Sequence, residues 1–314
     1  TMAAEKIAIL FPGQGSQYVG MAKEFLAESA SARDLMTMAE RVSNMPLGRL
    51  CLEGPMEELT RTLYLQPAMT VVNLICWQAM QKAGVKADFF AGHSLGEYAA
   101  LCAAGVLTPE ETLTLVTERG RLMEREAGAN PGGMHAVVKL DIDTVRGIVT
   151  TAQAKGALTL ANHNSAEQIV ISGESAALDA AAELVKEKGG KSIPLKVSGA
   201  WHSDLIRGAV PDFEKALARV DVKSPHTPLL FNVTAAAETD PATIRATMAR
   251  QIAATVRWYE IIQQFMAAEV RLFIEVGPKT VLTGLIKKII PADYPHKALQ
   301  VDSPETLAQC LAEL

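Results

Sequence analysis

A serine between two glycines is the part of this chain best suited to chemistry. The segment Gly92-His93-Ser94-Leu95-Gly96 follows a short apolar run, 87–91, and precedes a stretch with helical periodicity from 95 to 104. Between a strand and a helix, a G-x-S-x-G turn lifts the serine hydroxyl clear of the backbone. The first N–H groups of the helix can then donate to an oxyanion when the serine attacks an acyl carbonyl. The pattern therefore predicts that Ser94 is a nucleophile in acyl chemistry.

A serine nucleophile needs a base near neutral pH, and the chain contains six histidines. His93 adjoins the serine but points elsewhere on a tight turn, so we expect it to pack or to form hydrogen bonds. His202 lies in the loop segment Ser198–Ser203 and is the candidate base. A loop histidine alone is more often a surface residue than a catalyst, so this assignment depends on the motifs described below.

Apolar runs and helical periodicity alternate along most of the chain, which predicts an α/β fold. Strands are expected at 6–11, 87–91, 229–233, 271–276 and 298–301. Helices are expected at about 20–43, 67–83, 95–104, 109–127, 204–219, 241–252, 258–269, 279–289 and 304–313. The serine motif thus lies where the second strand of a buried sheet ends.

The pattern changes after Asn130-Pro131-Gly132-Gly133. Strand-like runs at 134–139, 158–162, 168–172 and 191–197 enclose helical stretches at 141–154 and 174–188. This β-α-β-β-α-β order is that of a ferredoxin-like unit. We therefore predict a large α/β-hydrolase-like domain with a parallel sheet core, formed by residues 1–129 and 199–314. Residues 130–198 are predicted to be an inserted ferredoxin-like subdomain.

The composition is that of a globular protein with ample core material: 314 residues, 49% hydrophobic, 21% charged and a net charge of −5. The acidic balance gives no reason to expect a nucleic-acid or membrane partner. Four scattered cysteines, without a CxxC or a Cys/His cluster, do not support a zinc or redox motif. The start, Thr1–Lys6, lacks the features of a signal peptide, and no apolar run is long enough for a membrane span. These features predict a cytoplasmic protein.

Six segments carry a resemblance to a known family, in the order Phe11–Gln17, Gly92–Glu97, the Arg119 segment, Trp201–Ser203, Gln251 and Glu275–Pro278. Through them, the chain resembles the malonyl-CoA:acyl-carrier-protein transacylases of fatty-acid synthesis and the related acyltransferase domains of polyketide synthases. The resemblance covers the chain from Ile7 to about Ile290. It implies transfer of malonyl from malonyl-CoA to the phosphopantetheine thiol of acyl carrier protein, through an ester on Ser94. It also implies a monomer that needs no metal or redox cofactor.

The resemblance assigns roles to single residues. Ser94 would be the nucleophile, and His202 its general base, oriented by a main-chain carbonyl instead of an aspartate. Gln14 and the backbone N–H of Leu95 would form the oxyanion hole. The substrate-binding residues would be Arg119, Gln251, which would help to position the acyl group, Asn162 from the small subdomain, and Trp201.

Two of these residues suggest a substrate preference. Malonyl carries a free carboxylate, and the planar guanidinium of Arg119 can bind a carboxylate through two hydrogen bonds. When unpaired, a buried arginine would reject neutral acyl groups because of its desolvation cost. The bulk of Trp201 predicts poor acceptance of methylmalonyl. Because the carrier protein of this family is acidic, we also expect a basic rim at the mouth of the site, with the candidates Lys188, Lys191, Lys287 and Lys288.

Three alternatives stay open on the sequence alone. A thioesterase or lipase shares the serine turn but places an acid and then a histidine late in the chain. A malonyltransferase of a polyketide system or of a malonate decarboxylase complex would share the chemistry and differ in pathway. An inactive scaffold that only docks carrier protein would have no need for Ser94, His202, Arg119 and Gln251 together.

Overall fold

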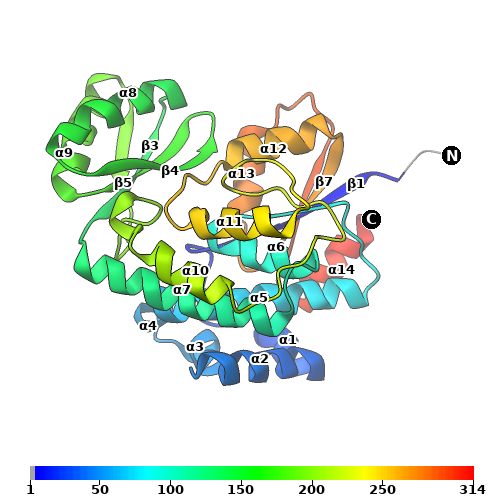
Figure 1. The fold of residues 1–314 in the computed structure, drawn as a ribbon. Coiled ribbons are helices and arrows are strands. Elements are labelled where there is room, and N and C mark those ends of the chain that lie inside the picture. Colours follow the sequence, from blue (N-terminus) through cyan, green and yellow to red (C-terminus); the bar gives the residue numbers. More distant parts are fainter. Residues whose placement is uncertain (1–3) are drawn as a thin grey trace.

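The chain folds around two separate sheets, as the computed structural model of residues 4–314 shows (Figure 1). Residues 1–3, at the start of the segment where no signal peptide was predicted, lie outside the described residues. The larger sheet is parallel, with the order β2-β1-β7-β8, and the smaller one is antiparallel, with the order β4-β5-β3-β6. The predicted fold class is confirmed.

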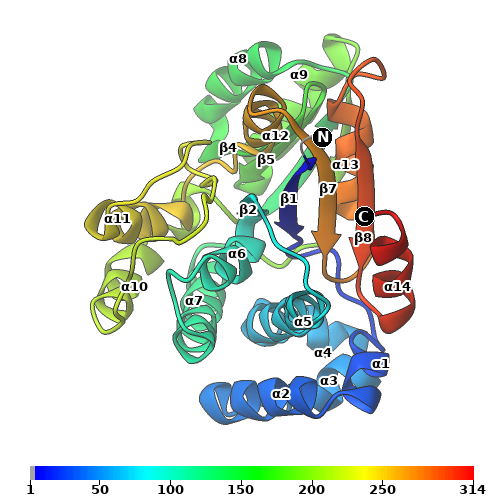
Figure 2. The ribbon, with the colours of Figure 1, turned by 90° about the vertical axis from the view of Figure 1, so that its right-hand side faces the viewer.

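The parallel sheet consists of β1 (Lys6–Phe11), β2 (Phe89–Gly92), β7 (Val270–Val276) and β8 (Lys297–Val301). Side chains alternate along β1, so that Ile9 and Phe11 face one cluster of helices, whereas Ala8 and Leu10 face another. Figure 2 shows the helices on the two sides of the sheet. They are α5 (Thr62–Lys82), α6 (Glu97–Ala103) and α7 (Pro109–Ala129) on one side, and α12 (Trp258–Ala267) and α13 (Val281–Ile289) on the other.

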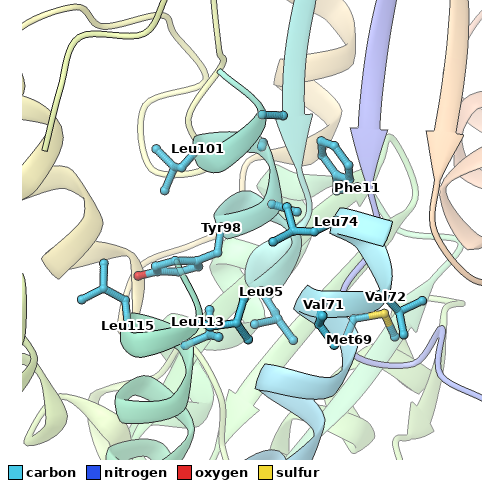
Figure 3. Packing of buried hydrophobic residues seen from close by; sticks show 14 of the residues in the cluster. Phe11, Met69, Val71, Val72, Leu74, Leu95, Tyr98, Leu101, Leu113 and Leu115 are labelled. Atoms are coloured by element: carbon cyan, nitrogen blue, oxygen red, sulfur yellow. The ribbon is translucent and has the colours of Figure 1, made fainter. Parts of the chain in front are cut away.

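The cluster that contains Ile9 and Phe11 packs against the serine turn. Figure 3 shows Phe11 of β1, Leu74 of α5 and Tyr98 of α6 among its members. Leu95, the residue after Ser94, is buried in the same cluster. The turn is therefore attached to the hydrophobic core on the side away from the serine hydroxyl.

The antiparallel sheet is built from β3 (Gly133–Val138), β4 (Leu158–Ser165), β5 (Gln168–Gly173) and β6 (Lys191–Pro194). Two helices, α8 (Ile142–Ala152) and α9 (Ser175–Glu187), bury Val145, Ala181 and their neighbours against it in a third cluster. The order of strands and helices is the one expected for a ferredoxin-like unit. All four strands fall within 130–198, although the domain boundaries themselves stay a prediction.

The remaining helices are mostly short. They are α1 (Lys23–Glu28), α2 (Ala30–Ser43), α3 (Leu47–Glu53), α4 (Met56–Thr60), α10 (Ala209–Leu217), α11 (Pro241–Gln251), α14 (Pro304–Ala312) and the 3₁₀ turns Ser94–Gly96, Gln153–Lys155 and Asp204–Ile206. Within residues 4–314, no helix has the length and apolar character needed to cross a membrane.

Three expected helices have different bounds in the structure. The one expected at 204–219 is divided into the 3₁₀ turn Asp204–Ile206 and α10. The helix expected at 20–43 is broken at Ser29, whose hydroxyl accepts from the N–H of Ala32 and so begins α2 as a separate helix. The helix expected to begin at Pro67 begins five residues earlier, at Thr62. The two helices α3 and α4 were not expected, because both are too short for periodicity to be visible.

The strand expected at 229–233 was wrong as a regular element. Only an isolated bridge joins Leu229 to Phe90 at the outer edge of β2. The pairing stops because the N–H of Asn232 donates to the carboxylate of Glu97, at 2.9 Å, and not to the backbone of a neighbouring strand. The chain turns away at this point and leaves the Asn232 side chain behind the serine turn.

The spacing of glycines in the serine motif follows from close backbone contacts. A Cβ at Gly92 would lie 2.0 Å from the carbonyl oxygen of Gly96, and a Cβ at Gly96 would lie 2.1 Å from that of Phe11. Both atoms belong to the backbone and cannot move aside. The turn therefore folds back on itself and onto the end of β1 only with glycine at both positions.

We predict that Gly96→Ala lowers the free energy of unfolding by about 2–3 kcal/mol, because the new methyl group overlaps backbone. Urea unfolding measures the effect. Gly147→Ala is the control, since Gly147 lies on the exposed side of α8, where a Cβ would have no atom within 4 Å. That change should raise stability by about 0.5–1 kcal/mol. Equal effects of the two substitutions would contradict the packing argument.

Candidate active site

Ser94 lies at the turn between β2 and α6 in a backbone conformation that is unusual for serine. Its φ angle is 52°, in the left-handed region, where a residue with a Cβ costs about 1–2 kcal/mol. Its Oγ lies 2.6 Å from Nε2 of His202, which itself has a φ of 58°. Strained residues cluster at functional sites, and here two of them meet through their side chains.

The hydrogen bonds of His202 fix its tautomer. Nδ1 lies 3.0 Å from the backbone carbonyl oxygen of Gln251, which only accepts, so Nδ1 carries the proton. Nε2 is then free to accept the hydroxyl proton of Ser94, as a general base must. Burial, followed by the charge of Arg119, lowers the pKa of His202 to about 3. The imidazole is therefore neutral at physiological pH.

Arg119 of α7 is buried beside this pair, with 1% of its surface exposed. Its two terminal nitrogens donate to Oε1 of Gln66 and to Oε1 of Gln251, both at 2.9 Å. The guanidinium also lies over the ring of Tyr98, 5.5 Å from the centroid. Among the residues that the structure describes, its Nε–H has no hydrogen-bond partner. A buried cation held by neutral groups, with a donor to spare, is suited to bind an anion.

A cavity of about 200 Å³ connects these groups. It is lined by every sequence-predicted site residue except one: Gln14, Ser94, Leu95, Arg119, Asn162, Trp201 and His202. Gln251 is the exception, and it reaches the site through hydrogen bonds. Besides its contacts with His202 and Arg119, its Nε2 donates to the backbone carbonyl of Ser94 at 2.8 Å.

The loop after β1 packs directly against the serine turn. A Cβ at Gly13 would lie 2.6 Å from the carbonyl oxygen of His93 and 3.5 Å from the nitrogen of Leu95. This close contact brings the neighbouring Gln14 to the same part of the cavity wall as Leu95. The N–H of Ser94 is already used, because it donates to Oδ1 of Asn232 at 2.8 Å. The Leu95 N–H is therefore the donor of the turn best placed for an oxyanion.

The antiparallel sheet closes the other side of the cavity. Backbone hydrogen bonds of 2.8 and 2.9 Å join β4 to Val256, and Asn162 lies between the two bonded residues. Asn164 of the same strand accepts from Nε2 of His93 at 2.7 Å. The histidine of the serine motif thus contacts the antiparallel sheet, and the base comes from elsewhere in the chain.

Comparisons with known proteins agree with this geometry. The family model described as an acyl transferase domain matches residues 9–300. A malonyl CoA-acyl carrier protein transacylase from Bacillus subtilis (strain 168) is 38% identical over 311 residues, which cover 98% of this chain and 97% of that protein. This chain belongs to the malonyl-CoA:acyl-carrier-protein transacylase family.

Solved structures of the transacylase family superimpose over nearly the whole chain. The crystal structure of an acyl-carrier-protein S-malonyltransferase from Burkholderia pseudomallei 1710b matches with a TM-score of 0.92 and 39% identity, covering 98% of this chain and 99% of that one. A malonyl-transacylase solved in complex with its type II PKS acyl-carrier protein matches with a TM-score of 0.94 and 31% identity, covering 98% and 100%.

Four buried side chains of this transacylase complete the site but were not identified from the sequence. Gln66 and Tyr98 hold the guanidinium, whereas Asn232 and Glu97 lie behind the serine turn. For Gln66 the sequence offers a weak indication, because it is a polar residue within a largely apolar stretch, and the structure shows that this stretch belongs to the buried helix α5. Glu97 belongs to the quoted serine motif, yet nothing in its local sequence indicates that its carboxylate is buried.

Glu97 is the second buried group of this transacylase site whose titration matters. Burial raises its pKa to about 7, and the hydrogen bond from the Asn232 N–H and the charge of Arg119 oppose this rise. Its side chain is 1% exposed. The pKa of Glu97 is thus raised toward neutrality, whereas that of His202 is lowered.

We predict that Arg119→Gln moves the low-pH limb of Ser94 reactivity to higher pH. Loss of the cation raises the pKa of His202, because the charge of Arg119 is the second largest cause of its depression. In the wild type, the limb lies far below the ordinary histidine pKa of about 6.5. The rate of Ser94 labelling by a fluorophosphonate, followed by intact mass between about pH 4 and 8, measures the shift.

Two variants serve as controls for this pH profile. Arg121→Gln removes an exposed cation from the same helix and should leave the profile unchanged. Glu97→Gln removes a second buried group of the site whose pKa lies in this range and so identifies its contribution. A limb that stays in place in Arg119→Gln would show that burial alone sets the pKa of His202.

Proposed function

We propose that this chain transfers a malonyl group from malonyl-CoA to the phosphopantetheine thiol of an acyl carrier protein, through a malonyl ester on Ser94. One observation carries the proposal: the reactive pair Ser94–His202 and the buried cation Arg119 line the same small cavity. A nucleophile attacks the thioester, and the cation selects an acyl group that ends in a carboxylate. Family membership agrees with both halves of this function.

The first half-reaction forms the ester. Oγ of Ser94 attacks the thioester carbonyl while Nε2 of His202 takes the hydroxyl proton. The resulting oxyanion accepts hydrogen bonds from the Leu95 N–H and from an N–H of Gln14. When the tetrahedral intermediate collapses, the carbon–sulfur bond breaks, and the CoA sulfur takes the proton from His202.

The second half-reaction reverses these steps with a different thiol. The phosphopantetheine thiol of the carrier protein gives its proton to His202 and attacks the ester carbonyl. Collapse breaks the bond to Oγ, and Ser94 recovers its proton from His202. Both half-reactions are redox-neutral acyl transfers with one acid–base group, so the proposal requires no metal or redox cofactor.

The malonyl carboxylate also affects the base. Bound to Arg119, it neutralises the charge that lowers the pKa of His202. The imidazole then becomes a stronger base when the correct acyl group is present, whereas acetyl has no such effect. Trp201 fills the neighbouring wall and is proposed to exclude the methyl branch of methylmalonyl.

The proposed setting is cytoplasmic fatty-acid synthesis, with the protein acting as a monomer and without a nucleic-acid or membrane partner. A polyketide pathway is the second candidate, because one of the matched structures was solved with a type II PKS acyl-carrier protein. Both settings use the same two half-reactions. They differ in which carrier protein is loaded fastest.

We predict that brief incubation with malonyl-CoA adds the mass of one malonyl group to the wild type and none to Ser94→Ala. Arg119→Ala should lose most of the malonyl adduct relative to an acetyl adduct from acetyl-CoA, since a buried arginine–carboxylate pair contributes about 1.5–3 kcal/mol. Intact-protein mass spectrometry measures all adducts.

The same samples distinguish transfer from hydrolysis. Addition of carrier protein should remove the adduct and load the carrier, with little free malonate. Release of malonate faster than loading would favour a thioesterase. An unmodified wild type together with unloaded carrier would contradict the proposed function.

Contacts near the cavity support the proposed basic rim for carrier-protein docking. Nζ of Lys288 donates to Oε1 of Gln168 at 3.1 Å, and Gln168 lines the cavity. In the antiparallel sheet, Val138 of β3 pairs with Gln168 on one side and with Lys191 on the other. The two lysines thus flank one end of this sheet, and Lys287 precedes Lys288 on the cavity-lining helix α13.

We predict that the double variant Lys287→Glu, Lys288→Glu slows loading of carrier protein by about tenfold or more but leaves acylation by malonyl-CoA unchanged. The control is Lys82→Glu, Lys86→Glu, which changes the net charge by the same amount. These two lysines precede β2, whereas Ser94 follows it, so they lie toward the opposite end of that strand. Stopped reactions analysed by mass give both half-reaction rates. An equal decrease in the rates of the two half-reactions would contradict a docking role for these lysines.

A further inference from the structure

The side-chain amide of Asn232 forms hydrogen bonds with two backbone groups of the serine turn. Asn232 lies 138 residues after Ser94 in the chain and is completely buried. Its Oδ1 accepts from the N–H of Ser94 at 2.8 Å, and its Nδ2 donates to the carbonyl oxygen of Gly92 at 2.7 Å. These two backbone groups lie on either side of His93, so the planar amide spans the tightest part of the turn.

The partners of this amide determine which way it faces. The carbonyl of Gly92 only accepts, and the N–H of Ser94 only donates. A second donor, Nε2 of Gln251, lies 3.3 Å from the same Oδ1. The position next to Ser94 therefore requires an acceptor, and the position next to Gly92 requires a donor. A side chain that only accepts cannot satisfy both.

The backbone of Asn232 is fixed as well. Its N–H donates to Oε1 of Glu97 at 2.9 Å, and its carbonyl accepts from the N–H of Arg257 at 3.0 Å. Glu97 is the first residue of α6, the helix that follows the serine turn. The loop and the turn are thus bound together at three points: Gly92, Ser94 and Glu97.

We propose that Asn232 is a positioning residue for the nucleophile. Its amide keeps Ser94 at its disfavoured φ of 52°, which directs Oγ toward Nε2 of His202. It also occupies the N–H of Ser94, so that the turn presents the N–H of Leu95 to the substrate. The inference rests on the proposed function only in that Ser94 is the residue that becomes acylated.

The substitution Asn232→Asp tests this role through pH. The new carboxyl group has the shape of the amide, and when protonated it can accept from Ser94 and donate to Gly92. When ionised it can only accept, and it faces the Gly92 carbonyl without a proton. The labelling rate of the variant, divided by that of the wild type, should therefore fall as pH rises through the pKa of the new carboxyl.

The experiment measures fluorophosphonate labelling of Ser94 in the full chain by intact mass, between about pH 5 and 9. A misplaced nucleophile costs about 100-fold in rate, which is the fall expected for the ratio. The charged and titratable groups near position 232 are Glu97, Tyr98, Arg119, His93, His202 and Arg257. These groups are the same in the wild type and in Asn232→Asp. Adding Glu97→Gln to each of these two proteins removes the contribution of Glu97, whose pKa lies in this pH range.

Asn232→Ala is the matched variant without a titrating group. It should label about 100-fold more slowly at every pH, with a constant ratio to wild type and an unchanged KM for malonyl-CoA. Labelling of Asn232→Ala at the wild-type rate, or a pH-independent ratio for Asn232→Asp, would overturn the proposal. If the alanine variant does not fold, as judged by thermal melting, the aspartate ratio decides alone.

A parallel reaction with malonyl-CoA separates this inference from the proposed function. A wild type that is labelled by the fluorophosphonate but not acylated by malonyl-CoA would contradict malonyl transfer while leaving the positioning role to be decided by the variants. Normal malonyl acylation of the wild type, together with rapid labelling of Asn232→Ala, would contradict the positioning role only.

Discussion

The charge of Arg119, buried without a carboxylate hydrogen-bonded to it, is the constraint on which the rest of the site depends. A cation in such a place is costly unless neutral donors and π-faces surround it. Gln66, Gln251 and the ring of Tyr98 supply that surrounding. They fix the guanidinium in place, while its Nε–H has no hydrogen-bond partner among the described residues.

The same charge also acts on His202, the hydrogen-bond partner of Ser94, and on Glu97. It lowers the pKa of His202 and opposes the rise in the pKa of the buried Glu97. Binding and chemistry are therefore electrostatically coupled across a single small cavity. If a neutral acyl group leaves the cation unpaired and the imidazole weakly basic, as proposed, selectivity is expected in the chemical step as well as in binding.

The sequence predicted the parts of the site that are specified locally. Ser94 and its flanking glycines are recognisable because a tight strand-to-helix turn needs those residue types in that order. The alternation of strands and helices between 130 and 198 likewise predicted the antiparallel sheet. Asn232 could not be found in this way, because its partners lie 138 and 140 residues away and its own segment resembles an ordinary strand. Long-range polar contacts leave no periodic signal in the residues that make them.

Gln251 links two functions that could have been separate. Its backbone carbonyl accepts from Nδ1 of His202, while its side chain is hydrogen-bonded to both the guanidinium of Arg119 and the carbonyl of Ser94. A change of side chain at this position therefore alters acyl recognition and nucleophile geometry together. Trp201 lines the cavity without any such shared bond among the described residues. We therefore expect substitutions at position 201 to change the acyl preference with less damage to the rest of the site than substitutions at position 251.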